Sequence, residues 1–242
     1  TNSNIWTPSA LGMSLWFDAS DLSTFTTDVN GNLLSWNDKS GDHPTTLVNI
    51  HGGGVMSDKN TMVFNIGSKM TSTNTDDFVY QQSFIVCEWD GGDIFTNYAG
   101  LFNGGIKYEI QLLGSFDSNV LYEPSLTAPS AVFGSSTLVV NGLLAPNPNT
   151  YPIIPPLRNG GGIVSQTKSA TMRGWSIGSQ SDHTIAEARG WTGKIAEVLI
   201  FNTVQSVANT EKIEGYLAHK WGLNVKLPSS HPYKIIAPIM IV

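Results

Sequence analysis

Short apolar runs, separated by clusters of glycine, asparagine, aspartate and proline, recur along the chain. Residues 62–66 alternate between apolar and polar side chains, which predicts a strand with Met62, Phe64 and Ile66 on one face. Residues 83–89 are the most apolar run and predict a central strand. Further strands are predicted at residues 14–18, 33–36, 108–112, 137–140, 175–178 and 195–201. Many short strands with turns between them are typical of a β-sandwich or a β-barrel.

Turn-forming residues mark the connections between these runs. Asparagine followed by glycine at residues 30–31 and 141–142 predicts two tight turns. The sequence Asp-Gly-Gly-Asp at residues 90–93 predicts a hairpin that joins the central strand to a strand at residues 94–96. Residues 141–162 contain five prolines, which lack the N–H group that a central strand needs, so we expect a long surface loop there.

One helix is predicted towards the C-terminus, because apolar side chains recur at helical spacing from Ile213 to Trp221. Ser206 is a candidate N-cap, and Gly222 stands where a glycine commonly ends a helix. No second core with a different pattern follows the proline-rich stretch. The chain is therefore expected to form one domain over residues 1–242.

The last eight residues, 235–242, form an almost wholly apolar tail, and such a segment must be covered by something. It can fold back as an edge strand over its own sandwich, or it can act as an assembly arm that adds to a neighbouring subunit. Pro238 limits a long strand but allows an edge strand, so the sequence favours neither reading. The arm would present Ile235, Ile236, Ile239, Met240, Ile241 and Val242.

The amino-acid composition excludes several classes of binding partner and of structural feature. Only 13% of the residues are charged, about half of the usual quarter. The net charge is −6 and the 13 basic residues are scattered, so neither nucleic acid nor an anionic membrane is an expected partner. The single cysteine, Cys87, excludes an internal disulfide. No apolar run of ~18 residues predicts a membrane span, and the first residues do not look like a signal peptide.

Five segments resemble one known family. Residues 14–21 (Ser-Leu-Trp-Phe-Asp-Ala-Ser-Asp) and residues 34–41 (Leu-Ser-Trp-Asn-Asp-Lys-Ser-Gly) look like the opening of a laminin G-like, concanavalin A-like lectin/glucanase domain. Residues 190–202 resemble the last strand of that family, residues 213–223 resemble the helix that often follows, and residues 227–233 match the tail of the same block.

The resemblance spans most of the chain, although residues 91–169 match only in outline. It implies an all-β fold, a two-sheet antiparallel jelly-roll sandwich with one short C-terminal helix. Domains of this bacterial and phage-like subtype resemble appendages of large surface proteins and of virion structural proteins. Members of the family bind glycans, bind proteins or decorate a particle, so the fold alone does not determine the function.

The tryptophans within the matched segments are expected to fill the core, because apolar residues flank them. These are Trp16, Trp36, Trp191 and Trp221. Trp6, Trp89 and Trp175 lie nearer to turn signals and are expected to be more exposed.

Glu88 and Asp90 are candidates for a catalytic pair, because glucanases of the family that the chain resembles carry acidic residues at alternate positions of one strand. The pattern breaks immediately, since Gly91 and Gly92 intervene before Asp93. We therefore interpret this stretch as a turn, and a glycoside hydrolase is the least favoured function.

A glycan site, if the protein has one, is predicted at the rim formed by residues 89–103. Aspartate and asparagine hydrogen-bond sugar hydroxyls, and an exposed aromatic ring offers a stacking face. We expect residues 89–103 to carry their polar side chains on turns. The candidates are Trp89, Asp90, Asp93, Asn97, Tyr98 and Asn103.

No cofactor is predicted, with calcium left open. Residues 28–32 begin like a calcium-binding EF-hand loop, but Leu33 and Lys39 stand where that loop needs a glycine and a glutamate. His43 and His51 are too widely spaced, without a nearby cysteine, to indicate zinc. The glycine triplets at residues 52–54 and 160–162 lack the strand-to-helix context of a phosphate loop.

These observations predict a non-enzymatic virion structural, decoration or adhesion protein, most naturally of a phage, that contacts neighbouring subunits and can also contact surface glycans. A homo-oligomer on the particle surface is expected. The alternative is a stand-alone carbohydrate-binding lectin module, and the alternative location is the bacterial cell surface, as part of a larger protein.

Overall fold

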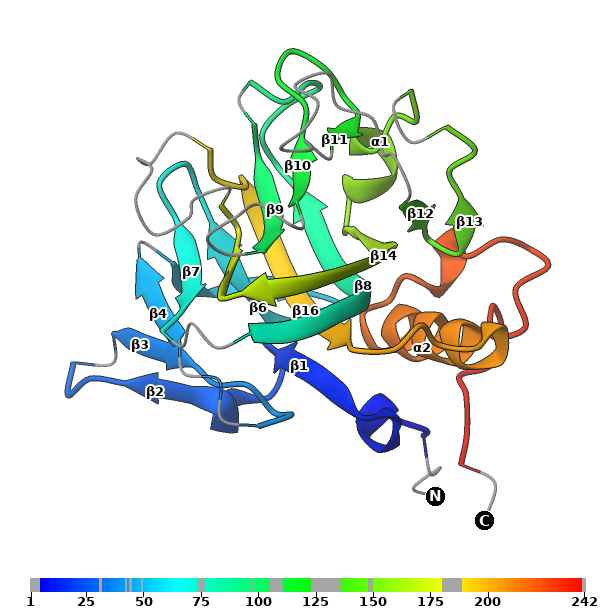
Figure 1. Ribbon diagram of the computed structural model, residues 1–242, viewed down its shortest axis with the longest axis horizontal. Helices are drawn as coiled ribbons and strands as arrows, with labels where there is room; N and C mark the ends of the chain where they lie inside the picture. The colour runs from blue at the N-terminus through cyan, green and yellow to red at the C-terminus, as the bar shows by residue number, and fades with distance from the viewer. Residues whose placement is uncertain are drawn as a thin grey trace.

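The computed structural model describes residues 5–30, 32–41, 43, 45–48, 50–73, 77–96, 98–104, 111–122, 136–147, 150–179 and 189–240. Within them, antiparallel strands form an eight-stranded sheet, a six-stranded sheet and a two-stranded hairpin (Figure 1). The predicted all-β sandwich is therefore confirmed. The jelly-roll connectivity implied by the family resemblance stays a prediction.

The eight-stranded sheet has the order β13-β12-β14-β8-β16-β6-β5, and β1 also pairs with β16. Its strands are β1 (Met13–Asp18), β5 (His51–Met56), β6 (Lys59–Phe64), β8 (Asp77–Trp89), β12 (Thr137–Val140), β13 (Leu143–Leu144), β14 (Gly162–Arg173) and β16 (Gly193–Phe201). The predicted central strand is the C-terminal half of β8, which pairs with β14 on one side and with β16 on the other.

The six-stranded sheet has the order β11-β10-β9-β15-β7-β4. Its strands are β4 (Thr45–Val48), β7 (Lys69–Ser72), β9 (Gly100–Gly104), β10 (Gln111–Gly114), β11 (Leu121–Tyr122) and β15 (Trp175–Ile177). The hairpin consists of β2 (Phe25–Thr27) and β3 (Leu33–Trp36). Of the strand predicted at 108–112, residues 108–110 lie outside the described residues. Both large sheets combine strands from the two halves of the chain.

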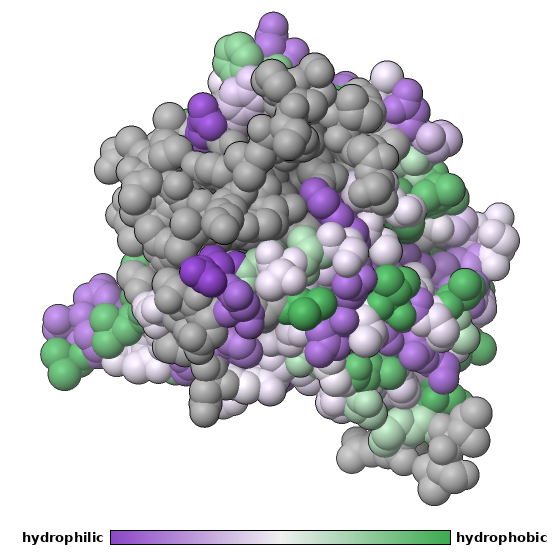
Figure 2. All heavy atoms as spheres, in the orientation of Figure 1, coloured by the Kyte–Doolittle hydropathy of each residue, from purple (hydrophilic) through white to green (hydrophobic). Residues whose placement is uncertain are grey.

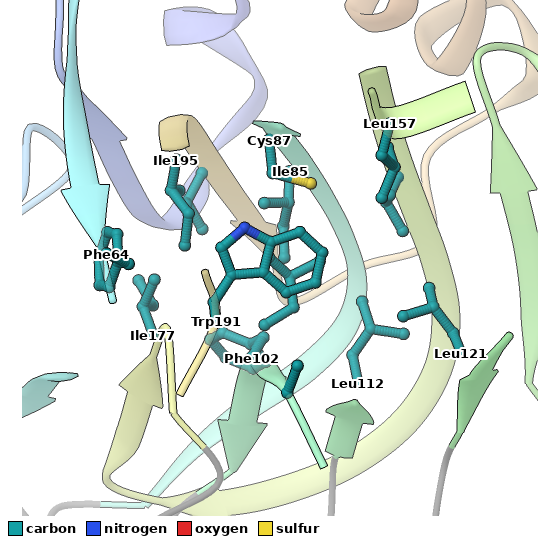
Figure 3. Close-up of a cluster of buried hydrophobic side chains, with 14 of the residues drawn as sticks. Phe64, Ile85, Cys87, Phe102, Leu112, Leu121, Leu157, Ile177, Trp191 and Ile195 are labelled. Carbon is teal, nitrogen blue, oxygen red and sulfur yellow. The ribbon is translucent and has the colours of Figure 1, made fainter. Parts of the chain in front are cut away.

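The main core lies between the two sheets. The ring of Trp191 is central to it, surrounded by side chains from both sheets (Figure 3). The Trp191 and Trp89 rings meet edge to face with centroids 5.0 Å apart. Across the sheets, Tyr80 of β8 stacks on Phe102 of β9 at 5.8 Å. Each aromatic side chain of this size buries about 150–250 Å² of surface and so contributes strongly to the core.

The period-two alternation in β6 is confirmed for Met62 and Phe64, which are fully buried. Ile66 is 60% exposed, so the prediction that it shares one face with Met62 and Phe64 is wrong. The strand ends at Phe64, and the alternation has no structural meaning beyond that residue.

A helix covers the outer face of the eight-stranded sheet. It is α2 (Val207–Lys220), and the Ser206 side chain caps it by accepting a hydrogen bond from the Asn209 N–H at 3.2 Å. Gly222 has a φ of 70°, and the Leu223 N–H donates to the Ala218 carbonyl, which together end the helix as predicted. The sheet face beneath the helix is apolar. Side chains of this face and of the helix form a second core cluster, which includes Phe84, Val86, Leu199, Ile213, Leu217 and Trp221.

Two predicted connections differ from the structure. Residues 141–162 contain β13 and a short helix, α1 (Ile154–Leu157), whose Ile154 and Leu157 are buried. The prediction of a long surface loop was therefore wrong for these two elements. The short helix forms there because prolines are tolerated in the first turn of a helix, where backbone N–H groups have no helical partner. Residues 94–96 form only a bridge between Phe95 and Ser118, not a strand.

A buried carboxylate joins the helix to the sheet. Glu197 of β16 is fully buried. Its Oε1 accepts hydrogen bonds from Trp16 Nε1 at 2.9 Å and from the Tyr216 hydroxyl at 3.0 Å. Its Oε2 accepts one from Trp221 Nε1 at 2.7 Å and contacts Lys220 Nζ at 2.8 Å. We call this group, together with Asp18, the Glu197 network.

Two carboxylates share the Lys220 ammonium, which also lies 2.8 Å from Asp18 Oδ1. Burial raises the pKa of Glu197, against the opposing attraction of Lys220. Burial acts in the same direction on Asp18, but the nearby Lys220 charge and hydrogen bonds from Lys220 and Ser20 outweigh it and lower the pKa of Asp18. The two carboxylates therefore titrate differently although one cation serves both.

Replacing Glu197 with alanine leaves two buried indole N–H groups and a tyrosine hydroxyl without their acceptor, and leaves the Lys220 ammonium with Asp18 as its remaining carboxylate partner. We expect the free energy of unfolding to fall by about 3–5 kcal/mol, as measured by urea denaturation. The matched control is Asp77→Ala, which removes an exposed ion pair with Arg173 (2.7 Å) and should cost less than about 1 kcal/mol. Losses of equal size in the two variants would contradict this account.

Acid should weaken the fold in a way that depends on Asp18. Because its folded-state pKa lies below the ordinary 3.8, Asp18 contributes stability above that pH and loses the contribution as pH falls through the folded-state value. In Asp18→Asn, the decline in unfolding free energy between about pH 4 and pH 2 should be shallower than in the wild type. Denaturation curves at several pH values test this, and identical slopes would be inconsistent with it.

Candidate functional site

The predicted glycan-binding residues do not form one site. Trp89 is only 2% exposed, and its Nε1 donates to the Gly92 carbonyl at 3.0 Å. The turn folds back over the indole so closely that a side chain at Gly91 would collide with the ring. The predicted exposure of Trp89 was therefore wrong, and its ring cannot stack on a sugar. Trp175 is likewise buried, whereas Trp6 is half-buried.

Asp90 and Asp93 lie on a turn rich in charges. Glu88, the preceding acidic residue of β8, is nearly buried and accepts hydrogen bonds from Lys194 Nζ at 2.5 Å and from the Gly160 N–H at 2.7 Å. Lys194 lies 3.9 Å from Asp90 Oδ2, and Arg158 forms an ion pair with Asp93. Burial and the Glu88 charge raise the pKa of Asp90. Glu88 is thus held by Lys194 and by the Gly160 N–H, and the same lysine lies between it and Asp90.

Tyr98 belongs to a different surface. Its ring lies 6.1 Å from that of Phe116, and the Arg189 guanidinium lies 5.0 Å above it. Phe116 is 57% exposed and Tyr98 is half-buried. Sequence reasoning missed Phe116, although an aromatic residue between Ser115 and Asp117 in a turn is an available signal for exposure. Asn97 lies outside the described residues.

Asn103 lies in β9 and is fully buried, so its predicted place on a turn was wrong. Its neighbours in sequence and register, Phe102 and Ile177, point into the core, and Asn103 therefore shares the opposite face of the six-stranded sheet with Ser176 and Thr71. In the described part of the chain, neither its amide oxygen nor its amide nitrogen has a hydrogen-bond partner. A buried amide of this kind is unusual.

The apolar tail contacts the first described residues of its own chain. Ile5 and Ile239 form an antiparallel bridge, and the Trp6 N–H donates to the Pro238 carbonyl at 3.0 Å. The side chains nevertheless face solvent, and apolar residues gather towards the lower right of Figure 2. We call the group the terminal apolar patch. It comprises Ile5 (51% exposed), Ile235 (80%), Ile236 (70%), Ile239 (57%) and Met240 (50%). Ile241 and Val242 lie outside the described residues.

Other candidate chemistry is engaged in the fold. Burial raises the pKa of the Cys87 thiol, which opposes formation of a reactive thiolate. Asp28 accepts hydrogen bonds from the Asn30 and Asn32 N–H groups, both at 2.8 Å, and so closes a turn. No cluster of three potential metal ligands occurs among the described residues. None of the helices in that part of the chain has the length and apolar character needed to cross a bilayer.

Comparison with known proteins does not extend this picture. No protein-family model matches the chain, and neither a curated protein nor a solved structure matches it. The resemblance to laminin G-like and concanavalin A-like domains therefore rests on the motifs alone.

Proposed function

We propose that this protein is a non-enzymatic structural or adhesion component of a phage-like virion, built on a lectin-like jelly roll, that assembles with copies of itself through the terminal apolar patch. The proposal rests on one observation. Large apolar side chains at both ends of the described chain remain exposed although the backbone segments that carry them are paired.

Two physical points support self-association. Exposed apolar side chains gathered in one place mark protein contacts on soluble proteins. The bridge between Ile5 and Ile239 also holds the two segments extended, and an extended segment at the margin of a fold can pair with another backbone. If the patch contacts the same patch on a second copy, a two-fold symmetric dimer covers the apolar side chains and pairs the extended segments.

The state of the acidic residues supports a non-enzymatic role. Glycoside hydrolysis needs two carboxyl groups that face a common cleft. The strongest candidates, Glu88 and Asp90, instead share Lys194, and Glu88 also binds the Gly160 N–H. The expected location is the particle surface, with a larger bacterial cell-surface protein as the alternative setting. Calcium has no proposed site.

Glycan binding is the second candidate function. The paired rings of Tyr98 and Phe116, with the Arg189 guanidinium over Tyr98, favour it because they provide a partly exposed stacking surface. This surface retains Tyr98 from the predicted rim and adds Phe116 to it.

Self-association should depend on the terminal apolar patch. Light scattering coupled to size exclusion is expected to give an oligomer for the wild type and a monomer for Ile236→Asp, because a charge would be buried at the contact. The control is Val29→Asp, at a fully exposed valine in the β2–β3 turn, far from the chain ends (Figure 1). A monomeric wild type, or an Ile236→Asp variant of unchanged mass, would overturn the proposal.

Glycan binding should depend on Tyr98. On a glycan array, Tyr98→Ala is expected to lose most of the wild-type signal, whereas Asp93→Ala, on the separate charged turn, and Asp77→Ala should leave it unchanged. The aromatic face accounts for ~1–1.5 kcal/mol, or about a tenfold loss. Equal signals for the wild type and Tyr98→Ala would refute the second candidate.

A further inference from the structure

The Lys220 ammonium lies between two carboxylates and contacts both. Its Nζ is 2.8 Å from Asp18 Oδ1 and 2.8 Å from Glu197 Oε2. All three side chains are shielded from most of the solvent, with exposed fractions of 15% for Lys220, 5% for Asp18 and 0% for Glu197. An amine held this close to a carboxyl group is well placed to react with it.

Other lysines of the described residues also contact two carboxylates, but in more open surroundings. Lys39 and Lys194 are the two examples. In each case one of the carboxylates faces solvent, with exposed fractions of 33% for Asp21 and 51% for Asp90. At Lys220 both carboxylates are buried, so water competes less with the contacts among the three groups.

Glu197 is placed to move protons. Burial raises its pKa, against the opposing attraction of Lys220. This carboxylate therefore accepts a proton from the ammonium more readily than an exposed carboxylate does. Hydrogen bonds of 2.7–3.0 Å from Trp16, Tyr216 and Trp221 fix its position. An amine that has lost a proton regains the lone pair that a nucleophile needs.

Asp18 has the surroundings of an acceptor for that nucleophile. Its Oδ1 accepts hydrogen bonds from the Ser20 N–H at 3.1 Å and from the Ser20 hydroxyl at 2.7 Å, and its Oδ2 accepts one from Lys39 Nζ at 3.1 Å. Fixed donors of this kind stabilise the charge that builds on the oxygens when an amine adds to the carboxyl carbon. Unlike Glu197, Asp18 also borders an open cleft of about 570 Å³, into which a released water molecule can pass.

From these contacts we infer that Lys220 and Asp18 condense to form an intramolecular isopeptide bond, with Glu197 as the catalytic residue. The ammonium gives one proton to Glu197, and the neutral amine forms a C–N bond to Asp18 Cγ. One C–O bond of Asp18 then breaks, and the oxygen leaves as water with the proton from Glu197 and a second proton from the nitrogen. An ammonium and a carboxylate become one amide and one water, and Glu197 returns to its starting form.

The bond would tie the end of β1 to the end of α2. Well-oriented groups react with effective concentrations of about 10⁵–10⁸ M, which offsets the cost of condensing an amine with a carboxylate in water. The cross-link closes a loop that spans most of the chain, and it therefore removes conformational freedom from the unfolded state. The inference depends on neither self-association nor glycan binding.

Mass spectrometry of the denatured full chain tests the inference. The intact mass of the wild type should be lower than that of the sequence by one water, and a tryptic digest should contain a branched peptide that joins Lys220 to Asp18. Lys220→Arg should keep the full mass, because a guanidinium keeps the charge but is not a nucleophile. Glu197→Gln should lose water about a hundredfold more slowly. The matched control is Lys194→Arg, which should condense as the wild type does.

The inference is overturned if the folded wild type keeps the full mass after prolonged incubation, or if it loses water without a branched peptide. A branched peptide that joins Lys220 to Glu197, or equal rates for the wild type and Glu197→Gln, would also overturn it. Asp18 no longer titrates in the condensed protein. The acid dependence expected of Asp18 is therefore measured in the Lys220→Arg background, which keeps an ion pair but cannot form the amide.

Discussion

Burying a carboxylate costs several kcal/mol unless donors surround it, and Glu197 lies fully buried between β16 and α2. Both of its oxygens are occupied, by two indole N–H groups, a tyrosine hydroxyl and the Lys220 ammonium. The donors come from β1 and from the end of α2, so this one side chain fixes the strand, the sheet and the helix relative to one another. The apolar cluster beneath α2 contributes the burial of apolar surface that attaches the helix to the sheet. The carboxylate determines the position of the helix.

The Glu197 network is linked to the β2–β3 hairpin, and α2 is linked to the tail. Asp18 binds Lys39 at 3.1 Å, and Lys39 in turn contacts Asp21 at 2.7 Å, just before the β2–β3 hairpin. In the other direction, α2 holds the segment that leads to the tail, because His219 Nε2 lies 2.8 Å from the Tyr233 carbonyl oxygen. The network thus extends towards the hairpin, and the helix that it attaches to the sheet holds the segment leading to the tail.

Local sequence pattern predicted much of the fold because strands and helices have their own periodicity. It predicted the central strand, the capped helix α2 and the burial of Trp36 and Trp191. It failed where position depends on distant contacts. The turn at Gly91 and Gly92 covers Trp89, and the alternation that suggested an inward Ile66 continues past the end of β6.

The candidate sites were harder to predict for the same reason. Glu197 interrupts an apolar strand, which signals a buried charge, but its partner Trp16 lies 181 residues away in sequence. Only the apolar tail was evident from the chain itself, because its residues are adjacent.

Hydrogen exchange on Glu197→Gln tests the central claim most directly. Glutamine keeps the size of the side chain but loses its charge and replaces one acceptor oxygen with a donor. The amides of α2 should then exchange faster by at least tenfold, while those of β8 and β14 in the inter-sheet core stay protected. Unchanged exchange in α2, or equal acceleration in both regions, would contradict the claim that Glu197 holds the helical layer in place.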